Sequence, residues 1–292
     1  MINPIIDMTI EALKPREEKL SGIVEAMPEE DYHVHPALSS TGARLLLDSP
    51  ARFKYRQDHA QPHKAAFDRG SAVHAKVLGV GYGVESLDFP DFRTKAAQEA
   101  RDAAYAAGLI PMLAKDLVIV DDIAEAVLAH PTARALLERP GTAEASVFAH
   151  DPRTGVEMRA RFDFLPDVTT GRRIAVDLKS IGKTASPDDF SRSVASFGYD
   201  VQQGHYLDTL ALSEGDGDAA MVFVVVESDA PHLVATYQLD VVWAEMGAAK
   251  ARRARELFRE CTDSGEWPGY PGEIGLLAPP TWAVYEHEEK FG

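Results

Sequence analysis

The segment Ile174-Ala175-Val176-Asp177-Leu178-Lys179-Ser180 places a carboxylate and an ammonium group two positions apart at the end of an apolar strand. Because successive side chains of a strand alternate between faces, Asp177 and Lys179 point to one side and Leu178 to the other. Charge beside a buried apolar run is costly unless it is paired or bound to a metal ion. The segment therefore predicts a functional site at the end of a sheet strand.

Further carboxylates lie at the ends of the two preceding predicted strands. Asp163 closes the strand that begins near Val156, and Glu144 precedes the strand that begins at Ala145. In an antiparallel meander Glu144 would lie near Asp163, with the third strand alongside. Acids and a lysine on neighbouring strands can hold a hard divalent cation and activate water beside a phosphate. The joint pattern predicts phosphodiester hydrolysis, although each acid taken alone could be a solvated strand-end carboxylate.

Composition sets limits on this interpretation. The chain has 292 residues, 45% of them apolar, enough for one large domain or one domain with an appended region. Its 30 basic and 46 acidic residues give a net charge of −16, which argues against tight stand-alone DNA binding but permits a basic channel and bound cations. Cys261 is the single cysteine, which excludes a disulfide framework and a four-cysteine iron–sulfur cluster.

No apolar run is long enough to span a bilayer, and the N-terminus lacks the features of a signal peptide. We therefore expect a cytoplasmic protein without membrane contact. No Walker A motif is present, so an ATPase partner would be a separate chain.

The predicted elements follow the order helices, three strands, helix, two strands, helix. Apolar periodicity, capping residues and turn signals define them. Helices are predicted after the caps at 39–41, at about 67–78, in two or three pieces within 94–139, at 186–212 with a break at Gly198, and at 241–261; strands are predicted at 145–150, 159–165, 174–178, 221–226 and 232–239.

Three side chains on predicted helices are further candidates. Gln202 and Tyr206 share a helix face because they are four residues apart, and they could contact the substrate phosphate and strand. Gln203 replaces Gln202 if the helix register differs, and Tyr206 could instead belong to a core stripe. His74 becomes a metal ligand if its helix packs across the sheet, and is otherwise a core histidine.

Four basic residues are candidate DNA contacts because guanidinium and ammonium groups match phosphate oxygens. Each could equally be an ordinary surface charge. They are Arg93, Lys95, Arg159 and Arg161.

Together these segments resemble the PD-(D/E)XK nuclease superfamily, and within it the RecB-like and exonuclease VIII (RecE)-like branch. The PD-(D/E)XK motif has a proline before its first aspartate, and this chain has Phe162 at that position, before Asp163. This departure is common in the branch. The resemblance is carried by residues 38–41, 49–53, 69–74, Glu144, 161–163, 177–179 and 202–206. It implies an α/β restriction-endonuclease-like core, a mixed central sheet flanked by helices, with a helical N-terminal portion.

The predicted division of the chain has three parts. A peripheral arm covers residues 1–31, the nuclease domain covers 32–262, and an extended C-terminal tail covers 263–292. Within the nuclease domain, the helical part covers about 32–140 and the catalytic sheet core about 141–262.

The resemblance also implies roles for the candidate residues. His74, Asp163, Asp177 and the backbone carbonyl of Leu178 would bind Mg²⁺, with Mn²⁺ as a substitute. Lys179 would position or polarise the attacking water, and Glu144 would support the metal site. Gln202 and Tyr206 match the helix motif of the branch.

The implied activity is that of an exodeoxyribonuclease working 5′-to-3′ on duplex DNA ends. It would expose single strands for an annealing protein in phage-type recombination, and it would act as a homo-oligomeric ring. The alternatives are an endonuclease or a nuclease preferring single strands or RNA, a non-catalytic DNA-end-binding module, and an unrelated α/β domain with accidental acids.

Overall fold

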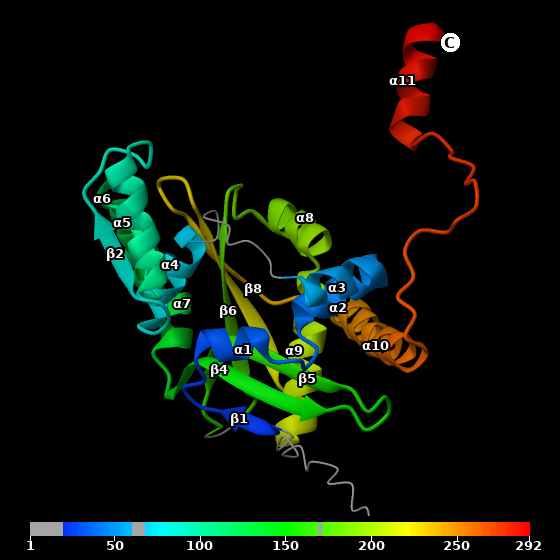
Figure 1. The fold of residues 1–292 in the computed structure, drawn as a ribbon, viewed down its shortest axis with the longest axis horizontal. Helices are drawn as coiled ribbons and strands as arrows, with labels where there is room; N and C mark the ends of the chain where they lie inside the picture. Colours follow the sequence, from blue (N-terminus) through cyan, green and yellow to red (C-terminus); the bar gives the residue numbers. More distant parts are fainter. Residues whose placement is uncertain (1–19, 60–67, 169–170) are drawn as a thin grey trace, which may run out of the picture.

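A mixed six-stranded sheet is the frame on which the helices are arranged (Figure 1). The computed structural model describes residues 20–59, 68–168 and 171–292. The strand order is β1-β4-β5-β6-β7-β8, with β6 parallel to β7 and the other neighbours antiparallel. These strands are β1 (Gly22–Val24), β4 (Gly141–His150), β5 (Glu157–Pro166), β6 (Ile174–Ile181), β7 (Ala220–Glu227) and β8 (Val234–Tyr237).

Helices cover both faces of this sheet. On one face, side chains such as Leu178 and Val224 pack against α4, α6 and α7. On the other, Phe223 and Val225 pack against α8 and α9, and α10 lies on α9. The helices are α1 (Glu29–Val34), α2 (Ser40–Asp48), α3 (Pro50–Asp58), α4 (Asp68–Leu78), α5 (Lys95–Ala106), α6 (Ala114–Ala129), α7 (Pro131–Leu137), α8 (Pro187–Phe197), α9 (Tyr199–Glu214), α10 (Val241–Ser264) and α11 (Thr281–Phe291). This arrangement confirms the predicted mixed sheet flanked by helices.

Local capping explains why several helices begin where the sequence predicts. The side chains of Ser39, Ser49 and Ser186 each accept a backbone N–H in the first turn of the helix that follows. Gly198 takes a left-handed conformation, with φ of 66°, and separates α8 from α9 at the predicted break. Phe67, where the fourth helix was expected to begin, lies outside the described residues.

Several elements were missed because they are short and owe their order to tertiary contacts. A parallel pair, β2 (Val84–Leu87) and β3 (Ile110–Leu113), precedes α6. Pro111 lies within β3 and is tolerated because β3 has a neighbour on one side only in this two-stranded sheet.

The two ends of the described chain also contain regular structure. Residues 22–24 of the predicted arm pair with β4 at the sheet edge, and α1 begins at Glu29. At the other end, α11 is carried away from the body by a segment without regular structure (Figure 1). The predicted limits of arm, nuclease domain and tail stay a prediction.

Helices α9 and α10 approach so closely that only glycine fits at two positions. A Cβ added at Gly247 would lie 2.0 Å from the Asp200 carbonyl oxygen, and one at Gly204 would lie 2.6 Å from the Ala248 nitrogen. The contact matters for the site because α9 carries Gln202 and Tyr206.

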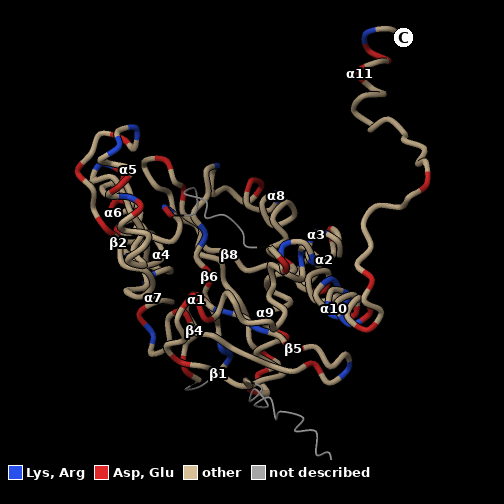
Figure 2. Tube along the Cα trace, in the orientation of Figure 1, with Lys and Arg blue, Asp and Glu red and all other residues tan. Residues whose placement is uncertain are grey.

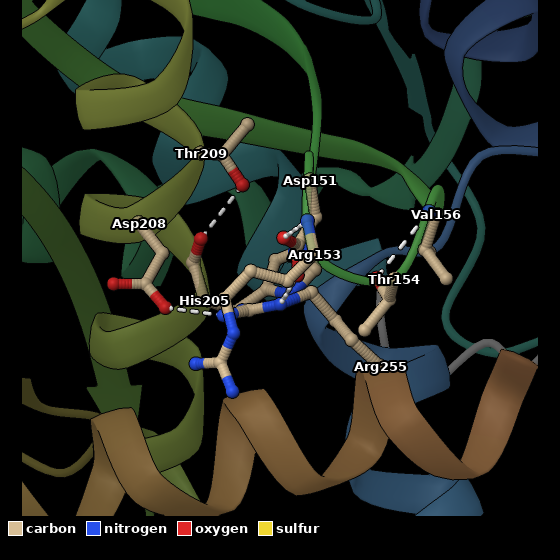
Figure 3. Close-up of polar contacts among 8 residues, drawn as sticks. All are labelled: Asp151, Arg153, Thr154, Val156, His205, Asp208, Thr209 and Arg255. Atoms are coloured by element: carbon tan, nitrogen blue, oxygen red, sulfur yellow. Dashed lines mark hydrogen bonds and ion pairs between the residues drawn. The ribbon is translucent and has the colours of Figure 1, made fainter.

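A buried arginine ties the same two helices to the sheet (Figure 3). Arg255 of α10 donates from Nε to Asp151, in the turn after β4, at 2.7 Å, and from Nη2 to Asp208 of α9 at 2.8 Å. Arg255 is 4% exposed, and the two carboxylates compensate for the burial of its charge. On α9, His205 Nε2 contacts the Arg159 carbonyl oxygen of β5 at 3.1 Å.

We predict that Gly247→Ala destabilises the fold by about 3 kcal/mol, because the new methyl group meets backbone that cannot move aside. Gly217→Ala is the matched control, since its Cβ would meet nothing within 4 Å. Denaturant unfolding of both variants measures the difference. Equal unfolding free energies for the two variants would contradict the close approach of α9 and α10.

Candidate active site and metal centre

The site is built where β5 and β6 separate. The two strands share one register pair, Phe164 with Val176, and the next step of the same register would join Asp163 to Asp177. There, the Asp163 carboxylate accepts a hydrogen bond from the Leu178 N–H at 2.6 Å. A side chain therefore satisfies the strand N–H at the point where the two strands part, and this fixes the carboxylate in place.

Both β4 and β5 depart from regular strand geometry next to Asp163. Phe162 packs on the α9 side of the sheet and Phe164 on the α4 side, although residues two apart on a regular strand share a face. Across from Asp163, Glu144 has φ of 52°, a left-handed backbone that costs a non-glycine residue about 1 kcal/mol or more. This strained step directs the Glu144 side chain to Asp163.

Three potential ligands from three elements converge at this opening. They are His74 of α4, Glu144 of β4 and Asp163 of β5, whose ligand atoms all lie within 4.8 Å of one another. His74 Nδ1 is 3.6 Å from Asp163 Oδ2. α4 thus packs across the sheet as the metal-ligand interpretation of His74 requires.

The second half of the site is the Asp177–Lys179 pair. Lys179 Nζ is in direct ion-pair contact with Asp177 Oδ2, and Gln202 Nε2 of α9 donates to Asp177 Oδ1 at 2.6 Å. The Asp177 side chain is 2% exposed, so its orientation is fully set by these two partners. The helix register therefore places Gln202, and not Gln203, on this carboxylate.

Burial and neighbouring charges shift the pKa values of several groups in the site. Burial, reinforced by the charge of Asp163 and opposed by Arg161, raises the pKa of Glu144 to about 8. Burial also raises the pKa of Asp177, against the opposing ammonium of Lys179. For Lys179, burial lowers the pKa, but the charges of Asp177 and Asp163 outweigh it, so the pKa is raised and the ammonium persists at neutral pH.

The donor set fits a hard divalent cation. Two carboxylates and an imidazole, with a further carboxylate adjacent, are ligands that Mg²⁺ and Mn²⁺ accept. Their 4.8 Å span is near the roughly 4–5 Å that separates opposite ligands around one such ion. A cation would also favour the ionised form of Glu144, against the burial and the Asp163 charge that raise its pKa.

The ligands open into a cleft of about 600 Å³. Its walls come from α1, α4, the segment before β2 and the central strands. Besides the three ligands they include Glu29, Tyr32, Tyr82, Arg161 and Tyr206. The Tyr206 ring also packs against Phe162, with centroids 5.0 Å apart, so this residue is both a core side chain and part of the cleft wall.

The four predicted DNA contacts fall into two groups. Arg159 and Arg161 are buried, and Arg161 donates to Ser146 Oγ at 3.0 Å and to the Met27 carbonyl oxygen. Arg93 and Lys95 are about 90% exposed and do not line the cleft in the described residues. A DNA-binding role for each stays a prediction.

Tyr32 of α1 is the site residue that the sequence did not reveal. The guanidinium carbons of Arg159 and Arg161 lie 4.8 and 4.7 Å from its ring centroid. Arg159 and Arg161 share a face of the strand because they are two residues apart, and such a pair indicates an aromatic partner. Nothing local identified Tyr32 as that partner, because it lies more than a hundred residues earlier.

These features define a PD-(D/E)XK nuclease fold with an acid and lysine site at diverging strands. The chain belongs to the family described as PDDEXK-like domain of unknown function (DUF3799), whose model matches residues 39–279. The superfamily predicted from the motif residues is thereby confirmed.

Among solved structures, the chain is similar to a crystal structure of an inferred exonuclease from Eubacterium rectale. The TM-score is 0.58 at 10% sequence identity, covering 92% of this chain and 100% of that chain, which shows the shared fold alone. A second structure, of SSO0001, has a TM-score of 0.28 at 12% identity, covering 68% of this chain and 88% of that chain, and carries no argument. No curated protein matches the chain.

None of the helices in the described residues combines the length and apolarity needed to cross a bilayer.

If the three ligands bind one ion, Mg²⁺ should stabilise the folded protein. At ten times the dissociation constant we expect about 1.4 kcal/mol, or roughly 3–6 °C in Tm. Asp163→Ala should lose this shift, while Asp167→Asn, an exposed acid just beyond β5, should keep it. Thermal unfolding with and without Mg²⁺ makes the comparison, and an equal shift in all three proteins would rule out the site.

Metal affinity should depend on pH through Glu144. With its pKa raised to about 8, the group holds a proton below that pH, and a metal ion must displace this proton to bind the carboxylate. Mg²⁺ affinity should therefore fall about tenfold between pH 9 and pH 7. Calorimetric titration tests this, and Glu144→Gln should abolish the difference. Unchanged wild-type affinity across this range would contradict the assignment.

Proposed function

We propose that this protein is a Mg²⁺-dependent exodeoxyribonuclease that degrades linear duplex DNA from its ends in the 5′-to-3′ direction. The observation that carries the proposal is the convergence of His74, Glu144 and Asp163 beside the buried Asp177–Lys179 pair. Membership of the PDDEXK-like family supports it.

Mg²⁺ bound by these ligands would polarise the scissile phosphate and lower the pKa of water. Around it, the chain's own groups have separable tasks. Asp163 is fixed by the Leu178 N–H, and Asp177 by Gln202 and Lys179, so the ligands are oriented before any ion arrives. The Leu178 carbonyl is proposed as an additional ligand.

Lys179 is proposed to orient the attacking water and to offset the charge that develops on the phosphorane. Its ammonium remains protonated because Asp177 and Asp163 raise its pKa against the effect of burial. At 17% exposure it lies at the edge of solvent, where a water molecule can reach it.

The cleft supports an end-directed activity. Its volume of about 600 Å³ holds a short stretch of one strand, and α1 contributes Glu29 and Tyr32 to its wall. We propose that one strand, separated at a duplex end, enters this cleft. Charges of both signs are interspersed over the body, so attraction to DNA is local (Figure 2).

The biological setting is proposed from the RecE-like resemblance. The products would be single strands for an annealing protein in phage-type recombination, in the cytoplasm. A homo-oligomeric ring is proposed with it, supported by apolar side chains in the C-terminal segment that are almost fully exposed and need a partner, namely Ile274, Leu276 and Leu277.

The test is incubation of purified protein with end-labelled linear duplex, with and without Mg²⁺. We expect Mg²⁺-dependent release of the 5′ label first, and survival of covalently closed circular DNA. Asp177→Ala and Lys179→Ala should each lower the rate by about 10³-fold or more, since each removes charge stabilisation from the transition state.

Lys115→Ala is the matched control, because this lysine is exposed and contacts the Pro90 carbonyl oxygen away from the cleft. Intact linear substrate after long incubation would refute the proposal. Equal cleavage of circles would favour the endonuclease alternative, and cleavage of single strands or RNA alone would favour the single-strand one.

A further inference from the structure

A further cavity, of about 350 Å³, lies between the end of β6 and α8, and the proposed function does not use it. Ser180 and Lys183 come from the end of β6 and the loop after it, and Arg192 and Ser196 come from α8. No carboxylate lines this cavity among the described residues. In a chain of net charge −16, two cations and several hydroxyls around one space favour an anionic ligand.

Tyr199 places this cavity next to Lys179 of the candidate active site. Tyr199 lines it, and the Lys179 ammonium lies 4.9 Å from the centroid of the Tyr199 ring. Ser180 to Lys183 follow Asp177 by three to six residues, which corresponds to about 10–20 Å along an extended chain. A nucleic acid strand with one phosphate at the metal centre therefore has neighbouring phosphates within reach of the cavity.

Lys183 makes no ion pair within 4 Å among the described residues. At longer range its charge contributes to lowering the pKa of Asp189, after the hydrogen bond from Thr184 and the contacts with Arg192. Asp189, the acid nearest to this loop, is occupied by Thr184 Oγ1 at 2.5 Å and Arg192 Nη1 at 2.9 Å. Glu227 accepts the Ala185 N–H at 2.7 Å. The neighbouring carboxylates are thus engaged in holding the loop and α8.

We propose that this cavity binds a backbone phosphate of the nucleic acid strand whose scissile phosphate lies at the metal centre. Lys183 provides the charge, and the Arg192 guanidinium adds a second contact. The inference rests on the proposed function, since it assigns the cavity to the same strand.

The test measures binding without cleavage, using a fluorescent single-stranded DNA oligonucleotide in EDTA over a range of NaCl concentrations. Lys183→Gln should weaken binding about fivefold at low salt and reduce the slope of log K against log salt by about 0.7, the value for one lost phosphate contact.

Lys290→Gln is the matched control, with the same change of charge on the distant helix α11, and it should bind like the wild type. Unchanged melting temperatures show that the variants are folded. A Lys183→Gln protein with wild-type affinity and slope would overturn the cavity assignment alone. A wild-type protein that binds no oligonucleotide would overturn the proposed function as well.

A position-resolved version uses strands in which one phosphate is replaced by a neutral methylphosphonate. At one position the neutral substitution should weaken binding to the wild-type protein but not to Lys183→Gln, because the variant already lacks the contact with that phosphate. Equal losses in both proteins at every position would contradict the proposal.

Discussion

The separation of β5 from β6 is the constraint on which the site depends. Where the backbone hydrogen bonds between β5 and β6 stop, the Leu178 N–H donates to the Asp163 carboxylate instead of to a backbone carbonyl. The opening admits His74 from α4 on one side and Gln202 from α9 on the other. The same opening accounts for the strained backbone of Glu144, since its carboxylate must reach the gap from the neighbouring strand.

The buried carboxylates of the site reduce the stability of the fold. Burial, reinforced by the charge of Asp163, raises the pKa of Glu144 and of Asp177, and the opposing charges of Arg161 and Lys179 do not cancel these shifts. A protein selected for stability alone would place apolar side chains here. The rest of the fold holds the arrangement in place, through the Gly204–Gly247 contact of α9 with α10 and the buried Arg255 bridge to Asp151.

The sequence predicted what local chemistry determines. Strand alternation placed Asp177 and Lys179 on one face, cap residues located the helix starts, and helix spacing put Gln202 on the site side of α9. It could not predict features set by distant contacts. The pairing of β1 with β4 and the position of Tyr32 between two arginines join residues more than a hundred positions apart. The left-handed Glu144 follows from the strand separation and has no local signal.

The central claim is that side chains of α4, β4 and β5 converge on one hard divalent ion next to Asp177 of β6. A crystal structure of the protein grown with Mn²⁺, with anomalous diffraction data, tests it most directly. The account predicts one strong anomalous peak in contact with His74, Glu144 and Asp163 and next to Asp177. An ordered site without a peak, or a manganese ion bound elsewhere by other residues, would contradict it.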